Sequence, residues 1–591
     1  NAVLNSAYKY FYFQITVIFF VLAVSFPLKS FANVNSAAGQ IVSTFGDVRV
    51  SSGPENPWRK VSGSEKLYIG YTVKTGRLSG ANLRMEDESL VRLSQNSEFK
   101  VEGVRISSFW RRATSLVSGV NRGLRSTYRL ITGKLWGRNN NRQLESTIHT
   151  TTATIGIRGT EYSIEADEKS SSVSIYEGAV LAQNEQGQAI IHSGERAVML
   201  LGQEPKKTTV IQAGKGVQWT VAVPELLDLG AFLKKSSDNK LFVAEIFHAY
   251  QLSQFATALD LLAAERSKNP DNLSLQIVAA WLNIKAGESA SVYAQLKVLV
   301  GQYPKNVSLM EFTAFSALLS GELAAAKSIL ASLKKRQQIS DTGWIVNGYV
   351  NQAEYNLPEA EKSYNRALAL NPQNQVAVVQ LATLYFGSEQ TDRALSLVNK
   401  LLKDDAANLA AANLKGFILL SQNKTAEALA IWQQSQKNEK ADGQTYFGLS
   451  LAYMRKGRVE EAMQSIATAV LLDPQRSMYL SYWGKMLHQI GRNEKALTVL
   501  DSAIRLDQMD PTPRLYKAII LRDLNRPGEA IRHIQAAIQL NDNRGVYRSR
   551  SLLDQDLAVQ NVDLSRLFTQ LGLSEWAHKK AMDSIKTDFT N

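Results

Sequence analysis

The chain has 591 residues, of which 45% are hydrophobic and 20% are charged, and its formal net charge is +13. This length exceeds what one hydrophobic core can organise, so we expect a multidomain protein of ordinary globular composition. Cysteine is absent, which excludes disulfides, thiolate metal sites, a catalytic cysteine and a lipid-modified cysteine anchor.

The amino-terminal stretch, residues 1–32, has the pattern of a secretory signal peptide. Lys9 precedes a largely apolar run from Tyr10 to Phe26, and small side chains at Ser30 and Ala32 occupy the positions that a signal peptidase reads. We therefore expect cleavage before Asn33 and export to the periplasm, where the mature protein could associate with the outer membrane. The alternative is a retained membrane anchor, because a run of about 17 residues is at the short limit for a spanning helix.

Residues 33–223 alternate between apolar and polar side chains with the period of two that is typical of strands. The clearest predicted strands are residues 47–50, 81–85, 89–93, 172–176 and 189–192. Glycines punctuate these stretches as turns. Short strands with regular turns predict an all-β sandwich or barrel.

One stretch of this region resembles the signature of the FecR domain family. Residues 151–162 read Thr-Thr-Ala-Thr-Ile-Gly-Ile-Arg-Gly-Thr-Glu-Tyr, and we take Gly156, Arg158, Gly159 and Thr160 as the signature residues. Glycines within a strand-like run indicate bulges or close backbone approach. Arg158 could pair with Glu161, and we favour such a structural role over a contact with a partner.

The resemblance implies an extracytoplasmic β domain. The family's namesake relays a transport signal from the outer membrane to a cytoplasmic sigma factor, a role that requires a cytoplasmic segment before a membrane span. Only about nine residues precede the apolar run of this chain. We therefore expect the module to carry over and not the signalling circuit.

A basic insertion occupies residues 103–142 of this domain, with no acidic residue between Glu102 and Glu145. The candidate anion-binding residues are Arg111, Arg112, Arg122, Arg125, Arg129 and Lys134. Interleaved aromatic residues would indicate nucleic acid in a cytoplasmic protein. Because export argues against nucleic acid, the functional interpretation is an anionic envelope polymer or a lipid phosphate. We favour the simpler alternative, a solvated insertion between two strands.

A linker over residues 224–238 leads to an internal repeat with a period of about 34 residues, which runs from 239 to 544 as nine units. Its clearest sign is a column of small residues in strict register: Ala258, Val292, Ala326, Ala360, Ala394, Ala428, Ala462, Ala496 and Ala530. Prolines that recur at one fixed position after a rung mark helix ends: Pro270, Pro304, Pro372 and Pro474. Each unit has the apolar pattern of two helices, and alanine lets the two helices approach closely where they cross.

The units resemble the tetratricopeptide repeat (TPR). The pattern is best kept in one unit, as Trp344, Gly348, Ala360, Tyr364, Ala367 and Pro372. The expected fold is therefore an all-β FecR-like sandwich followed by an all-α TPR solenoid.

The family implies a concave face that is lined by the first helix of each unit. The ninth and twelfth positions of the units supply the candidate partner-binding residues: Phe247, Trp281, Phe315, Tyr349, Phe417, Tyr250, Phe386 and Met454. An equally weighted alternative is that these side chains are buried between neighbouring helices. Later units carry Lys485, His488 and Arg522 at the same positions, so a groove would become more cationic toward the carboxyl end.

The regular phase ends after Arg544. Residues 545–591 form an irregular extension with a last, shifted helical pair from about Val562 to Thr590. This extension resembles a segment of long bacterial envelope proteins that combine FecR and TPR regions. No polar capping helix follows, which indicates truncation.

Motifs of catalysis, phosphate binding and zinc binding are absent from the sequence, and its six histidines lack metal-ligand spacing. We therefore expect no enzyme, no cofactor and no metal. The expected function is a periplasmic scaffold or adaptor that binds protein or peptide ligands in the TPR groove and docks its β domain to an envelope component, without nucleic acid. The alternatives are a signal-relay or regulatory protein of FecR type, or the periplasmic part of an outer-membrane export or assembly protein.

Overall fold

The computed structural model describes residues 37–61, 63–103, 126–139, 146–210, 224–226, 229–237, 239–268, 272–354, 356–388, 390–437, 441–540 and 561–587. The expected signal segment, residues 1–32, lies outside these ranges. So do Arg111, Arg112, Arg122 and Arg125 of the basic insertion. Among the helices that the structure describes, none combines the length and the apolar character needed to cross a membrane.

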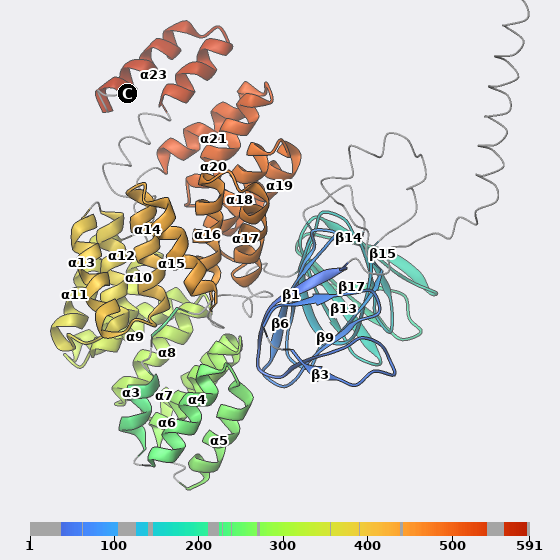
Figure 1. The fold of residues 1–591 in the computed structure, drawn as a ribbon, viewed down its shortest axis with the longest axis vertical. Helices are drawn as coiled ribbons and strands as arrows, with labels where there is room; N and C mark the ends of the chain where they lie inside the picture. The colour runs from blue at the N-terminus through green and yellow to red at the C-terminus, as the bar shows by residue number, and fades with distance from the viewer. Residues whose placement is uncertain are drawn as a thin grey trace, which may run out of the picture. The chain divides into compact units, whose positions relative to one another are not determined.

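The amino-terminal part is built from strands (Figure 1). They are β1 (Gly39–Phe45), β2 (Val48–Ser51), β3 (Arg59–Lys60), β4 (Glu65–Leu67), β5 (Thr72–Thr75), β6 (Gly80–Met85), β7 (Leu90–Leu93), β8 (Glu98–Gly103), β9 (Ser126–Arg138), β10 (Ser146–His149), β11 (Thr154–Ile157), β12 (Glu161–Ala166), β13 (Ser170–Glu177), β14 (Ala179–Asn184), β15 (Gly187–His192), β16 (Glu195–Leu200) and β17 (Lys206–Val210). Each of the five clearest predicted strands coincides with one of them, which confirms the period of two.

Two sheets share the long strand β9. One sheet has the order β4-β1-β6-β7-β9-β12-β13-β16-β17, and the other has the order β3-β2-β5-β8-β9-β10-β11-β14-β15. The pairing of β9 with β10 is parallel, and the other pairings are antiparallel. Inward-facing residues of both sheets, such as Leu83 and Val173 from one and Phe99 and Ile155 from the other, form one buried cluster. The region is therefore a sandwich whose halves are joined through β9.

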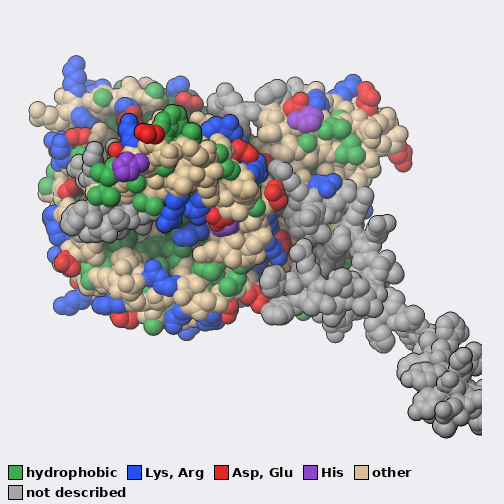
Figure 2. Space-filling view, turned by 90° about the horizontal axis from the view of Figure 1, so that it is seen from above, with side chains coloured by type: hydrophobic (Ala, Val, Ile, Leu, Met, Phe, Trp, Pro, Cys, Tyr) green, Lys and Arg blue, Asp and Glu red, His purple; other side chains and the backbone are tan. Residues whose placement is uncertain are grey.

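Strand β9 corrects the expectation of a solvated insertion for residues 126–138, the part of the basic stretch that it occupies. Its three cations each meet an acid: Arg129 lies 2.6 Å from Glu102, Lys134 lies 2.7 Å from Glu165, and Arg138 lies 2.5 Å from Glu161. Arg129 and Lys134, both proposed to bind anions, thus lie within a sheet and neutralise neighbouring carboxylates. On the face seen in Figure 2, cationic and anionic side chains are interspersed.

The remaining elements are helices (Figure 1). They are α3 (Leu229–Ser236), α4 (Lys240–Gln251), α5 (Phe255–Lys268), α6 (Leu273–Lys285), α7 (Ser289–Gln302), α8 (Val307–Leu319), α9 (Leu323–Lys335), α10 (Asp341–Ala353), α11 (Leu357–Leu370), α12 (Gln375–Gly387), α13 (Thr391–Asp404), α14 (Leu409–Ser421), α15 (Thr425–Gln436), α16 (Gly443–Arg455), α17 (Val459–Leu472), α18 (Ser477–Gln489), α19 (Asn493–Leu506), α20 (Thr512–Asp523), α21 (Pro527–Gln539) and α23 (Ser574–Thr587). Helix α3 shows that the expected linker over residues 224–238 is partly helical, because Leu229 and Leu233 bury one face.

Helices α4 to α21 form antiparallel pairs in an array. The first helix of most pairs begins after an asparagine whose side chain accepts a hydrogen bond from a backbone N–H of its first turn, as Asn408 does from Ala411. Gly457, in the turn between α16 and α17, has a φ of +72°, a conformation that favours glycine. Helices α11 and α17 end just before Pro372 and Pro474, as the prolines predict.

The column of small residues lies inside this array. Its eight alanines are 0% exposed and Val292 is 1% exposed. A larger side chain at a rung would therefore overpack a helix crossing. We expect Ala428→Leu, in α15, to destabilise the array by about 1–3 kcal/mol, measured by urea denaturation followed by circular dichroism.

The matched control is Ala430→Leu, which adds the same atoms to an exposed position of the same helix. This variant should unfold like the wild type. Equal losses in the two variants would show that the column does not mark the crossings.

Beyond the array, residues 561–570 are helical and α23 follows. Ala577 of α23 is buried, as are Leu564, Leu567 and Phe568 of the preceding helix. The irregular stretch from Tyr547 to Leu557 lies outside the described residues.

Candidate partner-binding groove

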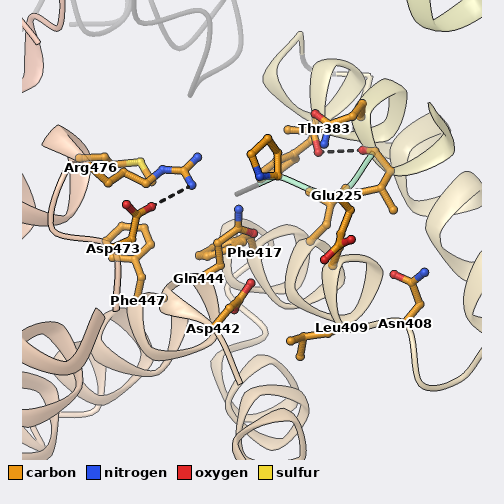
Figure 3. A pocket seen from close by; sticks show the side chains of 18 of the residues that line it. Glu225, Thr383, Asn408, Leu409, Phe417, Asp442, Gln444, Phe447, Asp473 and Arg476 are labelled. Carbon is orange, nitrogen blue, oxygen red and sulfur yellow. Dashed lines mark hydrogen bonds and ion pairs between the residues drawn. The ribbon is translucent and has the colours of Figure 1, made fainter. Parts of the chain in front are cut away.

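The first helices of the array line a cavity with a volume of about 2530 Å³. Residues from α4, α6, α10, α12, α14, α16, α18 and α20 contribute to its walls. Figure 3 shows Thr383, Leu409, Phe417 and Phe447 around it, together with Glu225 of the linker. The cavity thus follows the array along most of its length, and we call it the groove.

Six of the eight candidate partner-binding residues line the groove: Phe247, Tyr250, Tyr349, Phe386, Phe417 and Met454. Trp281 and Phe315 do not, and both are 0% exposed. Their rings pack 6.2 Å apart in the core of the array. The expectation of an open aromatic strip is therefore wrong at these two positions, where the buried alternative holds.

The helical phase explains why Trp281 is covered. Lys285 lies one turn later on α6, and its Nζ sits 4.8 Å from the centre of the Trp281 ring. Lys285 rather than Trp281 reaches the groove. A cation over an indole face is a favourable contact when it is shielded from water.

Three aromatic residues that continue from Phe417 toward the carboxyl end of the groove were not predicted: Phe447, Tyr482 and Tyr516. The ring centre of Phe417 lies 5.8 Å from that of Phe447, which lies 5.2 Å from Tyr482. Tyr482 lies 5.7 Å from Tyr516, and Lys485 Nζ lies 5.2 Å over the Tyr516 ring. The signal for these residues was an aromatic side chain at the fifth or sixth position of three successive units.

The charged side chains that line the described part of the groove have both signs. They are Glu225, Lys285, Asp392, Asp405, Asp442, Arg455, Asp473, Arg476 and Lys485. Asp473 and Arg476 form an ion pair of 3.7 Å, drawn as a dashed line in Figure 3. Three of the four cations belong to the later units, whereas four of the five acids precede them, so the lining becomes more cationic toward the carboxyl end, as expected.

Of the three cations expected to line the carboxyl end, only Lys485 does so. His488 bonds Asn493 and Asp523. Arg522 pairs with Asp563 at 2.6 Å. His488 thus connects α18 to α19 and α20, and Arg522 connects α20 to the helical residues 561–570 beyond the array. A position count within one unit cannot reveal such contacts.

The linker reaches the amino-terminal end of the groove, where Pro224 and Glu225 line the cavity. Glu225 places its carboxylate 2.6 Å from Lys285 Nζ, and Tyr349 donates its hydroxyl to the Glu225 carbonyl oxygen at 2.7 Å. Burial opposes the charge on Lys285, but the Glu225 carboxylate, together with Tyr250, holds the pKa of this lysine above its ordinary value. Leu226 is buried in the core of the array.

Profiles of three known families match this chain. FecR protein matches residues 71–181, the N-terminal TPR repeats region of Psidin matches residues 380–484, and a tetratrico peptide repeat matches residues 456–549. The chain contains a FecR domain and a TPR array. The resemblances read from the signature residues and from the repeat are thus confirmed.

Known proteins are similar to this chain over part of its length. A TPR repeat-containing protein of Treponema pallidum is 25% identical over 225 residues, which cover 34% of this chain and 28% of the relative. Cell division cycle protein 27 homolog B of Arabidopsis thaliana is 32% identical over 76 residues, which cover 13% of this chain and 10% of the relative. The chain thus spans less than a third of the length of these relatives.

Solved structures of similar fold include a tetratricopeptide repeat protein from Parabacteroides merdae, with a TM-score of 0.32 and 16% identity over 43% of this chain and 98% of that one. The human IFIT1 dimer with m7Gppp-AAAA has a TM-score of 0.41 and 12% identity, over 62% of this chain and 96% of that one.

The signature residues of the FecR domain lie in and after β11. Gly156 is within the strand, and Gly159 has a φ of +63° in the turn to β12. Thr160 is buried, and its carbonyl oxygen accepts a hydrogen bond from the backbone N–H of Asn139 at 2.9 Å. A Cβ at Gly178 would lie 2.7 Å from the Thr160 Cγ2. The signature therefore forms a tightly packed corner.

Glu161, the residue after this corner, pairs with Arg138. The partner suggested by the sequence was Arg158. Arg138 Nη2 lies 2.5 Å from Glu161 Oε2, and Trp136 Nε1 donates to Glu161 Oε1 at 3.0 Å. Arg138 and Glu161 are both buried, whereas the side chain of Arg158 is exposed. The ion pair links β9 to β12 inside the domain.

Proposed function

We propose that this protein is a non-enzymatic adaptor that holds an extended segment of a partner protein in the groove of its TPR array. TPR arrays are protein-interaction scaffolds, and FecR domains and TPR repeats are typically non-catalytic. The groove itself carries the proposal. Its volume of about 2530 Å³ exceeds the roughly 300–1,000 Å³ of small-molecule sites, and it runs along the array as an extended chain would require.

The lining fits the chemistry of an extended polypeptide. Aromatic faces such as Phe417 and Tyr482 offer apolar contact with alternate side chains, while amides such as Gln380 and Gln444 offer hydrogen bonds to main-chain groups. Charges of both signs along the lining would select the register of the bound segment.

The proposal places the protein in the periplasm, with the FecR domain docked to an envelope component. The amino-terminal sequence pattern supports export. The FecR match supports an extracytoplasmic role for the β domain.

Peptides selected on the full chain by phage display should test the groove. Thr383 lies on α12 and lines the groove, so Thr383→Trp should block the path of an extended segment. We expect the selected peptides to bind this variant at least tenfold more weakly, a loss of about 1.4 kcal/mol, by fluorescence anisotropy.

The control is Lys400→Trp, which places the same side chain on the exposed face of α13, the second helix of the same pair. It should bind the peptides like the wild type. Peptides that bind both variants equally would show that the groove is not the binding site.

A further inference from the structure

The linker already supplies an extended segment to the groove. Pro224, Glu225 and Leu226 have no helical or strand structure, and Pro224 and Glu225 line the cavity. They are held by the Lys285 ion pair, by the Tyr349 hydrogen bond and by burial of Leu226. The linker therefore shows how the groove can hold a polypeptide segment.

Each of the three contacts recognises a feature that a partner segment could reproduce. Lys285 presents a cation whose side chain is only 14% exposed, so an acceptor of opposite charge is strongly preferred beside it. Tyr349, which is 9% exposed, donates to a main-chain carbonyl and so reads no particular side chain. Leu226 is 2% exposed and belongs to the apolar core of the array.

The same contacts are of a kind that can be released. Glu225 keeps 56% of its side chain exposed, so water can solvate its carboxylate after release, whereas Lys285, which is 14% exposed, then favours another carboxylate in its place. No backbone hydrogen bond of a helix or strand fixes these three linker residues. The burial of Leu226 is the contact that opposes release, so a partner must supply an apolar side chain in its place.

We propose that residues 224–226 are a built-in competitor for the amino-terminal end of the groove, and that the partner is an extended protein segment with an acidic residue directly before a large aliphatic one. This inference rests on the proposed function and adds the chemistry of the ligand to it. The partner's carboxylate replaces that of Glu225 on Lys285, its carbonyl takes the Tyr349 hydroxyl, and its aliphatic side chain takes the site of Leu226.

A tethered competitor has a high local concentration, on the order of millimolar for a short linker. A partner segment therefore binds the wild-type chain with an apparent affinity that is reduced by the fraction of molecules in which the linker occupies the site. Weakening the linker alone should strengthen binding in trans.

The probe is a fluorescein-labelled peptide with the sequence of residues 222–229, Ala-Val-Pro-Glu-Leu-Leu-Asp-Leu, and a second peptide in which glutamine replaces its glutamate. Both are titrated against the full chain and against Glu225→Gln, a variant that keeps the shape of an exposed side chain. We expect the glutamate peptide to bind the Glu225→Gln chain at least tenfold more tightly than it binds the wild-type chain. On the Glu225→Gln chain, the glutamate peptide should also bind at least tenfold more tightly than the glutamine peptide.

The double variant Glu225→Gln/Lys285→Met removes the cation as well, and circular dichroism verifies that it folds. This double variant should bind the glutamate peptide and the glutamine peptide equally. An unchanged affinity in Glu225→Gln, or a preference that survives Lys285→Met, overturns the inference. If the peptides selected by display still depend on Thr383 in that case, the groove function stands without this ligand. If they do not, the proposed function fails as well.

Discussion

Replacing Trp432 by alanine should destabilise the array by about 3–5 kcal/mol, because this side chain fills the space between the first helices of two successive units. Trp432 lies on α15 and is 0% exposed. A Cβ at Gly416 of α14 would lie 2.5 Å from its ring, and one at Gly448 of α16 would lie 2.1 Å from it. Urea denaturation should show the loss, with a broadened transition because units couple mainly to their neighbours.

The matched control is Trp576→Ala in α23, where the same truncation removes a side chain that is 60% exposed. This variant should lose less than about 1 kcal/mol. Trp432→Phe should cost less than Trp432→Ala, because the Trp432 Nε1 is buried without an acceptor among the described residues. Equal losses in the free energy of unfolding for Trp432→Ala and Trp576→Ala would mean that α14 and α16 do not pack against Trp432.

The repeat could be predicted from the sequence because its evidence is local and repeated. One alanine per unit, as at Ala360, and one proline after the second helix, as at Pro372, set the phase of both helices of that unit. The structure then places Gly348 against Tyr364, where a Cβ would lie 2.3 Å from the ring. A small residue that packs against a large one can be predicted from the sequence when the same pair of positions recurs in successive units.

The lining of the groove could be predicted only in part. A ninth-position aromatic residue faces either the groove or the next helix, depending on how each pair is rotated against its neighbours. Trp281 turns inward and Lys285 takes its place, whereas Phe417 faces the groove. The position of Glu225 was not foreseen either, because nothing in a linker sequence states where the chain will lie.

Strand β9 was missed for an electrostatic reason. A stretch rich in arginine and lysine is typical of a solvated segment, and only the acids of neighbouring strands make it compatible with a sheet. Glu102, Glu161 and Glu165 lie on other strands or at their ends, each far along the chain from its partner on β9. Pairing over such separations is a property of the fold, so the sequence pattern alone could not indicate it.

Arg138→Met should destabilise the FecR domain by about 3–5 kcal/mol, since it leaves the buried Glu161 carboxylate without its cation. Arg138 is 1% exposed, and it connects β9 to the strand that follows the signature corner. Trp136 would still donate to Glu161, but one neutral donor does not balance a buried charge. Because a multidomain chain does not unfold in one step, hydrogen exchange of peptides from β9 and β12 is the suitable measurement.

The double variant Arg138→Met/Glu161→Gln separates the loss of the ion pair from the burial of a lone charge. Glutamine keeps an acceptor for Trp136 Nε1 and removes the negative charge, and methionine keeps most of the volume of Arg138. Within the described residues, Arg138 Nε and Nη1 have no hydrogen-bond partner, so the substitution removes the ion pair and the contact of the guanidinium with the Trp136 ring, whose centre lies 5.8 Å away. We expect the double variant to regain most of the protection lost in Arg138→Met, because an apolar or neutral replacement of a whole buried pair is often close to neutral. A double variant as unstable as the single one would show that the pair contributes through its attraction, and that the corner after Thr160 depends on that attraction to close.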